Sequence, residues 1–513
     1  MKNALFALAL WTAAASFAGA VTYHSLNLAG EADNGIFAED LTGTGRFDLI
    51  GLAAGRIAIF RADPAQQAGY SPTPEVLVTG PTAYFADAAD VLPDKGKEIL
   101  ILTPEGVWAF VQADGRFNPR PSPLIRCDTI LSLNTLRSGI AAQYQPNVQV
   151  LPWNFAFDTN GDGLDDVLVP HDKGTDVYLQ KPSGQFARPM TLSLFPIIHH
   201  FAAPGHKADE FHQTTSRSTR LQMVVPSLES RDVNGDGKPD LVSGPYWFAQ
   251  KLDGTFDTTA AQLPPDRQSQ LAPNIRIADI NNDKKPDRFT EENVMDDPLN
   301  IVTRVRVFLA DRAGKLPENP TQVIVDQNVL IHTNLPLHDF DGDGCLDFAM
   351  YKTDITVTEI AKWVRQAFGQ IEGNLNFFLF NRAANCYGTR PDRRVAPSSS
   401  KPITMRFKVD LMEAMMGLVW ERYLSTMMRF EGDYNGDGRP DLLVREKTEQ
   451  ISIYFNTGRR DPLFSRDPDI VLDNLPNFGG LALSDLNADG CTDLLLYSGN
   501  YDQVIAVYIS RKK

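Results

Sequence analysis

The sequence has few cysteines and, after its first 20 residues, no long apolar run. Four cysteines in 513 residues are too few for a disulfide scaffold, and they lack the paired spacing of a zinc site. No segment beyond residue 20 is apolar over the roughly 20 residues that a membrane-spanning helix needs. With 43% hydrophobic and 22% charged residues, the composition also excludes disordered, collagen-like and coiled-coil chains. We therefore expect a globular protein with a large core.

Basic residues are outnumbered by acidic ones, 49 to 64, which gives a net charge of −15. This charge opposes binding to nucleic acids and anionic lipids, and it favours cations as partners. The GxSxG, HExxH, P-loop and GxGxxG signatures are also absent. Their absence weakens the hypothesis of an enzyme without excluding it, because carboxylate-based catalysis has no local signature.

The first 20 residues have the features of a secretory signal peptide. Lys2 precedes an apolar run from Ala4 to Ala15, and Ala18-Gly19-Ala20 is the small-x-small pattern that signal peptidase accepts. We expect cleavage after Ala20, which leaves residues 21–513 as a secreted or periplasmic protein. The chain would then reach an oxidising compartment in which calcium is accessible.

One nine-residue pattern recurs along the chain, Asp-x-(Asn/Asp)-x-Asp-Gly-x-x-Asp, with six clear copies. Oxygen donors at positions 1, 3, 5 and 9 and a backbone carbonyl at position 7 suit Ca²⁺, which binds six to eight oxygens. The expected metal ligands are Asp158, Asn160, Asp162 and Asp166; Asp232, Asn234, Asp236 and Asp240; Asp279, Asn281, Asp283 and Asp287; Asp339, Asp341, Asp343 and Asp347; Asp433, Asn435, Asp437 and Asp441; and Asp485, Asn487, Asp489 and Asp493.

Position 12 distinguishes these loops from the helix-flanked calcium hand, which needs a Glu there. The six copies have Val169, Ser243, Thr290, Met350, Val444 and Leu496 at that position. The last acidic ligand is therefore expected at position 9. Twenty of the 64 acidic residues lie in these six loops, so their charges would repel one another unless cations neutralised them.

Two weakened copies precede the clear ones, which makes eight units in all. The first runs from Asp40 to Asp48 with Thr42 and Thr44 in place of charged ligands, and the second runs from Asp90 to Glu98 with Leu92 and Lys95. We expect these two loops to be metal-free or of low affinity.

Short runs of β-branched and aromatic residues precede and follow each loop, as in Phe155–Phe157, Val167–Val169 and Ile451–Tyr454. Such runs, separated by turn signals, are typical of strands. Four strands repeated about eight times predict an all-β propeller with eight blades, or with seven as the alternative. The last unit lacks residues for a fourth strand, whereas Thr22–Leu28 is a strand without a blade. We therefore expect the N-terminal strand to complete the C-terminal blade and close the ring.

The repeated strand, acidic loop and strand resemble the FG-GAP/VCBS repeats of the integrin α-subunit β-propeller and of many secreted bacterial proteins. Phe478-Gly479-Gly480 before the last loop is similar to the Phe-Gly half of the motif. The resemblance covers nearly all of residues 21–513 and implies a single propeller domain, calcium in the hairpin loops, and a binding or adhesive role.

Residues 352–430 depart most from the repeat. Val357, Ile360, Val364 and Phe368 have helical spacing, as have Leu411, Met415 and Leu418 later in the same range. We expect a partly helical insertion within the propeller that covers one of its faces or sides.

A second departure is the group of histidines His199, His200, His206 and His212. It is either a transition-metal or acid–base site, or a polar surface loop; its spacing matches no zinc motif. Of the cysteines, Cys345 and Cys386 belong to one unit, and we expect a disulfide between them. Cys127 and Cys491 are either paired with each other or buried as thiols.

Together these features predict a secreted or periplasmic calcium-binding propeller that acts as a binding or adhesion module for a glycan or a cell-surface protein. The alternative is a carbohydrate-active enzyme, a polysaccharide lyase or hydrolase built on the same scaffold. That alternative rests on fold analogy alone. The sequence does not identify the ligand.

Overall fold

The computed structural model describes most of residues 21–512. The described residues are 21–26, 28, 31–80, 83–93, 95–113, 115–132, 150–202, 219–263, 274–297, 300–327, 335–353, 369–371, 373–395, 405–407, 428–447, 449–460, 462–478, 480–497 and 504–512. The expected signal peptide, residues 1–20, lies outside them.

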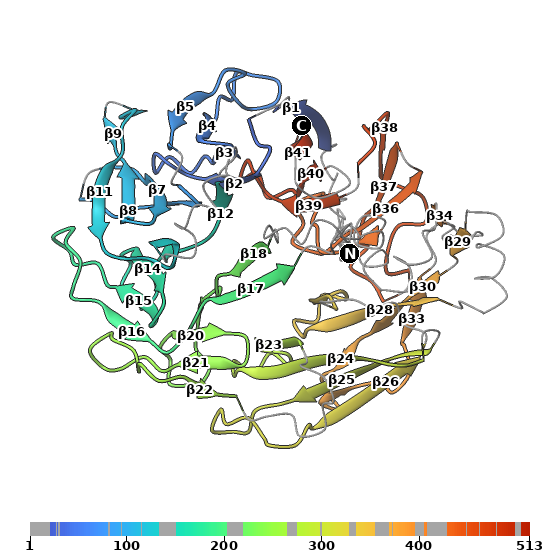
Figure 1. Cartoon of the computed structure of the whole chain (residues 1–513). Coiled ribbons are helices and arrows are strands. Elements are labelled where there is room, and N and C mark those ends of the chain that lie inside the picture. The colour runs from blue at the N-terminus through green and yellow to red at the C-terminus, as the bar shows by residue number, and fades with distance from the viewer. Residues whose placement is uncertain are drawn as a thin grey trace, which may run out of the picture.

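The strands form eight antiparallel sheets arranged in a ring, which confirms the eight-bladed β-propeller (Figure 1). Blades 1 to 4 are β2 (Gly35–Glu39), β3 (Asp48–Ala53), β4 (Arg56–Phe60) and β5 (Glu75–Val78); β6 (Phe85–Ala89), β7 (Glu98–Thr103), β8 (Gly106–Phe110) and β11 (Ser122–Arg126); β13 (Ala156–Phe157), β14 (Asp166–His171), β15 (Gly174–Tyr178) and β16 (Met190–Leu192); and β19 (Glu229–Arg231), β20 (Asp240–Ser243), β21 (Tyr246–Phe248) and β22 (Ala261–Gln262).

Blades 5 to 8 follow in chain order, and the last of them takes its fourth strand from the N-terminus. They are β23 (Asn274–Ala278), β24 (Asp287–Asp297), β25 (Asn300–Phe308) and β26 (Gln322–Gln327); β27 (Leu337–His338), β28 (Asp347–Thr353), β30 (Gly373–Phe378) and β33 (Arg393–Val395); β35 (Met428–Arg429), β36 (Leu442–Lys447), β37 (Gln450–Tyr454) and β38 (Ile470–Asp473); and β39 (Gly480–Ser484), β40 (Asp493–Tyr497), β41 (Val504–Lys512) and β1 (Val21–Leu26).

Smaller elements lie between or beside the blades. They are the pairs β9 (Gln112–Ala113) with β10 (Arg116–Phe117), β17 (Ile197–Ala202) with β18 (Thr219–Val224), β29 (Gly369–Ile371) with β34 (Met405–Phe407), and β31 (Phe380–Asn381) with β32 (Cys386–Tyr387); β12 (Leu151–Pro152), which pairs with β6 in parallel; and the 3₁₀ turn η1 (Ile130–Ser132).

The second strands of blades 1 and 2 are largely apolar because both of their faces are covered. All six residues of β3 and all six of β7 are buried. The core lies between facing blades: Ile50 and Ile57 of blade 1 pack with Ile99 and Ile101 of blade 2. Each fully buried side chain of this size contributes about 1.5–3 kcal/mol. A blade therefore cannot bury its own faces and depends on its two neighbours.

The N-terminal strand closes the ring, as the missing fourth strand of blade 8 predicted. β1 pairs with β41 in antiparallel register from Val21 opposite Lys512 to Leu26 opposite Val507. Leu26 and Val507 share an apolar cluster with Leu49 of blade 1. The two ends of the chain therefore complete blade 8, which packs against blade 1 (Figure 1).

The range 352–430 contains more of the propeller than the sequence suggested. β30 and β33 are the third and fourth strands of blade 6, and β35 begins blade 7. The described residues of this range form strands and turns. The two segments with helical spacing, around Val357–Phe368 and Leu411–Leu418, lie outside the described residues, so the helical insertion stays a prediction.

Candidate metal centres in the blade loops

All eight acidic loops occupy the same place in their blades. Each connects the first strand of its blade to the second, and we number it loop 1 to loop 8 after the blade. Because the blades repeat around the ring, the loops lie on one face of it. The sequence repeat therefore corresponds to a structural repeat.

The backbone of the loop turns through the left-handed region at positions 4 and 6. Gly161 and Gly163 of loop 3 have φ values of 79° and 84°. In loop 5 the same positions are Asn282 and Lys284, with φ values of 57° and 66°. Residues with a Cβ rarely adopt this conformation, so its retention without glycine indicates that the fold requires this loop shape.

The carboxylate at position 1 organises the loop from within. In loop 7, Asp433 Oδ1 accepts hydrogen bonds from the N–H of Gly436 (2.7 Å) and Asp437 (3.2 Å), and Oδ2 accepts from Gly438 N–H (2.7 Å). Asn435 Oδ1 at position 3 accepts from Asp437 N–H at 2.9 Å. The loop backbone therefore holds the side-chain oxygens at positions 1, 3 and 5 in place. Less conformational entropy is then lost when an ion binds.

The acid at position 9 is the first residue of the second strand, or directly precedes it, and it is fully buried. Asp441 Oδ2 accepts from Tyr434 N–H at position 2 of its loop (2.8 Å), and Oδ1 accepts from Asn456 N–H just beyond β37 (2.7 Å). The corresponding pairs are Asp166 with Thr159 and Gln180, Asp240 with Val233 and Gln250, Asp287 with Ile280 and Ala310, Asp347 with Phe340 and Phe380, and Asp493 with Leu486 and Ser510. One carboxylate thus joins the loop to the third strand of its blade.

The residue after the third strand also reaches the loop of the preceding blade. The side-chain amide of Gln250 in blade 4 donates to Asn160 O in loop 3 (2.5 Å), and that of Asn456 in blade 7 donates to Phe340 O in loop 6 (3.0 Å). Gln112 in blade 2 donates to Leu41 O in loop 1 at 2.7 Å. The loops therefore take part in the contacts between blades.

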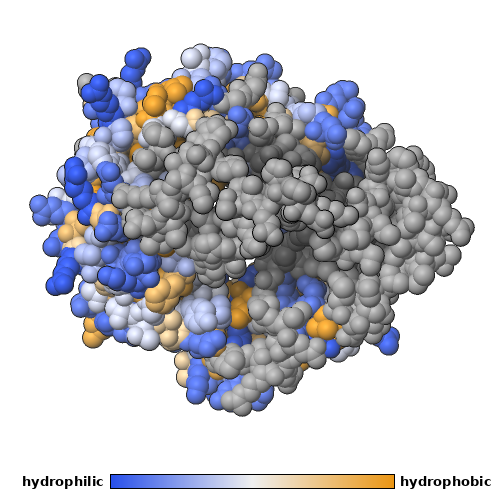
Figure 2. Space-filling view, in the orientation of Figure 1, coloured by the Kyte–Doolittle hydropathy of each residue, from blue (hydrophilic) through white to orange (hydrophobic). Residues whose placement is uncertain are grey.

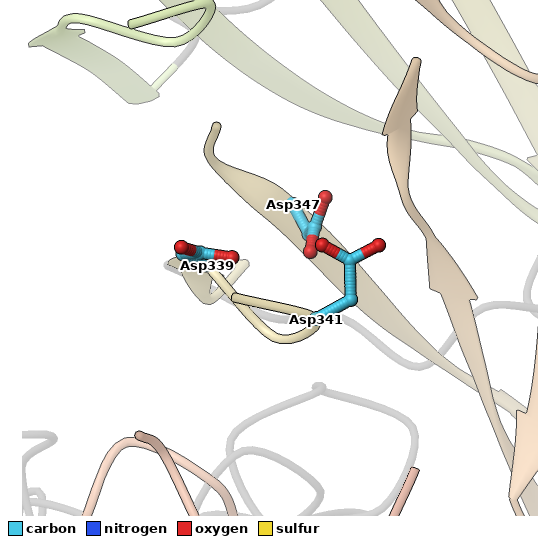
Figure 3. Close-up of side chains that lie close together, drawn as sticks. All are labelled: Asp339, Asp341 and Asp347. Atoms are coloured by element: carbon cyan, nitrogen blue, oxygen red, sulfur yellow. The ribbon is translucent and has the colours of Figure 1, made fainter. Parts of the chain in front are cut away.

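Loop 6 brings three carboxylates together. Oxygens of Asp339, Asp341 and Asp347 all lie within 4.8 Å of one another (Figure 3). The side chain of Asp341 is 1% exposed, and its Oδ1 is buried without a hydrogen-bond partner. A buried carboxylate oxygen without a donor is costly, so this donor set fits a cation. Of the six clear loops, loops 3 to 8, loop 6 has Asp at position 3, where the other five have Asn.

Burial gives the acids at position 9 a preference for the neutral form. Burial, together with the charge of Asp341, raises the pKa of Asp347 to about 8 despite the hydrogen bond from Phe380. Burial likewise raises the pKa of Asp441 to about 8 and that of Asp493 to about 7. At neutral pH these carboxylates therefore need either a proton or a cation to offset their charge.

The acid at position 9 of each weakened loop also has a partner within the protein. In loop 1, Arg61 Nη1 lies 2.9 Å from Oδ2 of Asp48, the acid at position 9. In loop 2, Glu98 is buried and accepts from Val91 N–H at 3.1 Å. Arg61 thus offsets the charge of Asp48. That loop 1 is metal-free or of low affinity stays a prediction. The Arg61–Asp48 pair could not be predicted from the sequence, because thirteen residues separate its members.

The expected disulfide is not formed. All four cysteines are free thiols, and Cys345 is buried at position 7 of loop 6. Its thiol contacts Asn281 O in loop 5 at 3.6 Å, whereas Cys386 lies in the β31–β32 hairpin. Membership of one blade therefore did not bring the two sulfurs together. Of the other two cysteines, Cys491 is buried and Cys127 is partly buried.

The histidine group is only partly described. His199 and His200 lie in β17, which pairs with β18 between blades 3 and 4. His206 and His212 lie outside the described residues, so their role remains a prediction. Within the helices that the structure describes, none is long and apolar enough to cross a membrane.

Comparison with known families supports the repeat. A profile of the FG-GAP-like repeat matches residues 232–290 and 433–496, that is, loop 4 to β24 and loop 7 to β40. No curated protein sequence matches the chain. The chain therefore contains FG-GAP-like repeats, and their arrangement as an eight-bladed propeller agrees with the resemblance to the integrin propeller.

Several solved structures are similar over most of the chain. A lectin from Agrocybe aegerita that recognises non-reducing terminal N-acetylglucosamine is 15% identical with a TM-score of 0.41, over 93% of this chain and 98% of the lectin. The V. cholerae biofilm matrix protein Bap1 is 12% identical with a TM-score of 0.26, over 93% and 76%. A Photorhabdus luminescens Tc holotoxin pore is 13% identical with a TM-score of 0.31, over 94% of this chain and 19% of the toxin chain. At these scores none of the three informs the function of this chain.

Proposed function

We propose that the chain is an exported calcium-binding propeller that binds glycan or protein partners outside the cytoplasm. The observation that carries the calcium assignment is the repeated donor geometry of loops 3 to 8. In each of these loops the acid at position 9 is fully buried and the acid at position 1 is fixed by backbone N–H groups. Hard oxygen donors held in this way suit Ca²⁺.

The residues that would hold calcium are the expected ligands at positions 1, 3, 5 and 9 with the carbonyl at position 7. Bound calcium would offset the repulsion between these carboxylates and the free-energy cost of burying their charge. The acid at position 9 joins the loop to the third strand of its blade. The side-chain amides of Gln250 and Asn456 join loops 3 and 6 to the next blade. In this proposal calcium stabilises the ring instead of taking part in a reaction.

Hollows at two blade junctions on the loop face support a binding role. One has a volume of about 430 Å³ and lies between loops 2 and 3, where Lys97, Asp165 and Lys181 line it. Asp165 accepts a hydrogen bond from Asp90 N–H at 2.8 Å, which joins loops 2 and 3 at one side of the hollow. The second hollow, of about 250 Å³, lies between blades 1 and 8 and includes Asp489 and Arg511. Hollows of this size with a few charged groups suit small polar ligands such as sugar units.

The visible surface agrees with a polar partner. Figure 2 shows hydrophilic residues over much of the coloured outer part of the molecule, with hydrophobic residues in small groups. The most exposed apolar side chains include Leu252, Val78 and Val325, which lie in separate blades. Scattered residues of this kind are normal and do not form one apolar docking surface.

A glycan array probed with the calcium-loaded protein tests the binding role. We expect glycan binding in calcium, and Lys181→Ala should weaken the affinity for the best ligand about tenfold, the effect of losing one charge-assisted hydrogen bond. Lys173→Ala, on the exposed β14–β15 turn, is the matched control and should bind as the unmodified chain does. An array without hits would contradict a glycan partner. Conversion of a bound glycan to product would instead identify the enzyme.

A further inference from the structure

Loop 6 differs from the other clear loops in a contact with its neighbouring blade. Arg460 lies in the connection between β37 and β38 of blade 7. Its Nε lies 2.5 Å from Asp341 Oδ2, and its Nη2 lies 3.5 Å from Asp343 Oδ2. Asp341 and Asp343 are the expected calcium ligands at positions 3 and 5, so the guanidinium lies directly against the donor set.

In two other clear loops, the basic side chain that pairs with an acid belongs to the loop itself. Lys285 in loop 5 and Arg439 in loop 7 pair with acids of their own loops, Asp283 at 3.9 Å and Asp437 at 2.7 Å. Arg460 instead forms its ion pairs with a clear loop of another blade. Loop 6 also has the extra acid at position 3, and Arg460 contacts that residue.

We infer, on the basis of the calcium sites proposed above, that Arg460 is a tethered counter-cation that competes with Ca²⁺ for Asp341. The guanidinium and the ion have the same sign of charge and share Asp341 and Asp343, so each lowers the affinity of the other for the loop. Arg460 is therefore a residue that sets the calcium affinity of loop 6. The effect is reciprocal, because coupling between two binding events is the same in both directions.

This competition makes the contact between blades 6 and 7 sensitive to calcium. Without calcium, Arg460 offsets part of the charge of loop 6 and holds it against blade 7. When calcium occupies the loop, the ion pair weakens, while Asn456 still donates to Phe340 O at 3.0 Å and keeps the backbone contact. The two blades then remain packed through Phe340, Phe377 and Phe464.

Calcium titration of full-length Arg460→Gln by equilibrium dialysis tests this inference. We expect one site to bind calcium about tenfold more tightly than in the unmodified chain, whereas the remaining sites keep their affinities. Asp343→Ala, which removes the ligand at position 5, identifies that site, because the difference between its titration and that of the unmodified chain isolates loop 6. The calcium-free Arg460→Gln protein should also melt at a lower temperature than the calcium-free unmodified protein, a readout that does not depend on binding.

Two control variants separate charge from position. Arg459→Gln removes the adjacent arginine, for which the structure gives no ion pair, and should titrate as the unmodified chain does. Arg460→Lys keeps the positive charge and should leave the affinity of loop 6 within about threefold of its original value. Equal affinities of loop 6 in Arg460→Gln and the unmodified chain would overturn the inference and leave the calcium sites standing. An unmodified chain that binds no calcium would overturn both.

Discussion

Removal of calcium is expected to lower the melting temperature of the protein by on the order of 15 °C. A site held at 100 times its dissociation constant contributes about 2.7 kcal/mol, and loops 3 to 8 are six such sites. For a chain of this length, about 1 kcal/mol corresponds to about 1 °C. The measurement is a melting curve of protein dialysed free of calcium, with and without calcium added back.

The same experiment has an expected pH dependence. Because burial raises the pKa values of Asp347 and Asp441 to about 8, the folded calcium-free protein binds protons more tightly than the unfolded chain. This contribution to stability is complete below the unfolded pKa of about 4 and is lost as the pH rises through about 8. Calcium favours the charged carboxylates, so its removal should cost more at pH 8 than at pH 5.5. Equal melting temperatures with and without calcium at pH 8 would contradict the proposal.

Replacement of an acid at position 9 should destabilise the protein even without calcium. Asp441→Ala leaves the buried N–H groups of Tyr434 and Asn456 without acceptors, each of which costs about 1–3 kcal/mol. With the cavity that the shorter side chain leaves, we expect a loss of about 3–5 kcal/mol in the free energy of unfolding. Urea denaturation of calcium-free protein measures it.

Two milder substitutions in loop 7 serve as controls for this prediction. Asp441→Asn keeps one acceptor oxygen and should lose less than Asp441→Ala. Asp437→Asn changes an exposed acid whose Oδ1 accepts from Arg439 N–H, a bond that the amide oxygen can keep, so we expect a change below about 1 kcal/mol. If Asp441→Ala and Asp437→Asn were equally stable without calcium, position 9 would be a metal ligand alone and not a structural link.

The fold was predictable because its signals are local and repeated. The acidic loop, the apolar runs on either side of it and the missing fourth strand of the last unit were enough to predict the blades and the closure of the ring by β1. Eight loops gave eight blades because the weakened loops 1 and 2 keep their place between strands, even though Thr42 and Leu92 replace ligands.

The contacts that distinguish one loop from another were not predictable, since they join residues that are distant in the chain. Arg460 is separated by 119 residues from Asp341, and nothing in the sequence near either of them indicates the pair. The repeat predicts a metal ligand at position 9, but it does not indicate that Asp441 also accepts hydrogen bonds from Tyr434 N–H and Asn456 N–H. The expected Cys345–Cys386 bridge was wrong for the same reason: membership of one blade does not fix the direction of two side chains.

A direct count of bound ions tests whether loops 3 to 8 hold calcium. Protein equilibrated with calcium and freed of excess by gel filtration is analysed for metal by mass spectrometry. We expect about six calcium ions per chain, and one fewer in Asp343→Ala, which removes the Asp that all six loops have at position 5. A chain that retains fewer than two ions would contradict this expectation, because the repeated donor geometry would then serve hydrogen bonding alone.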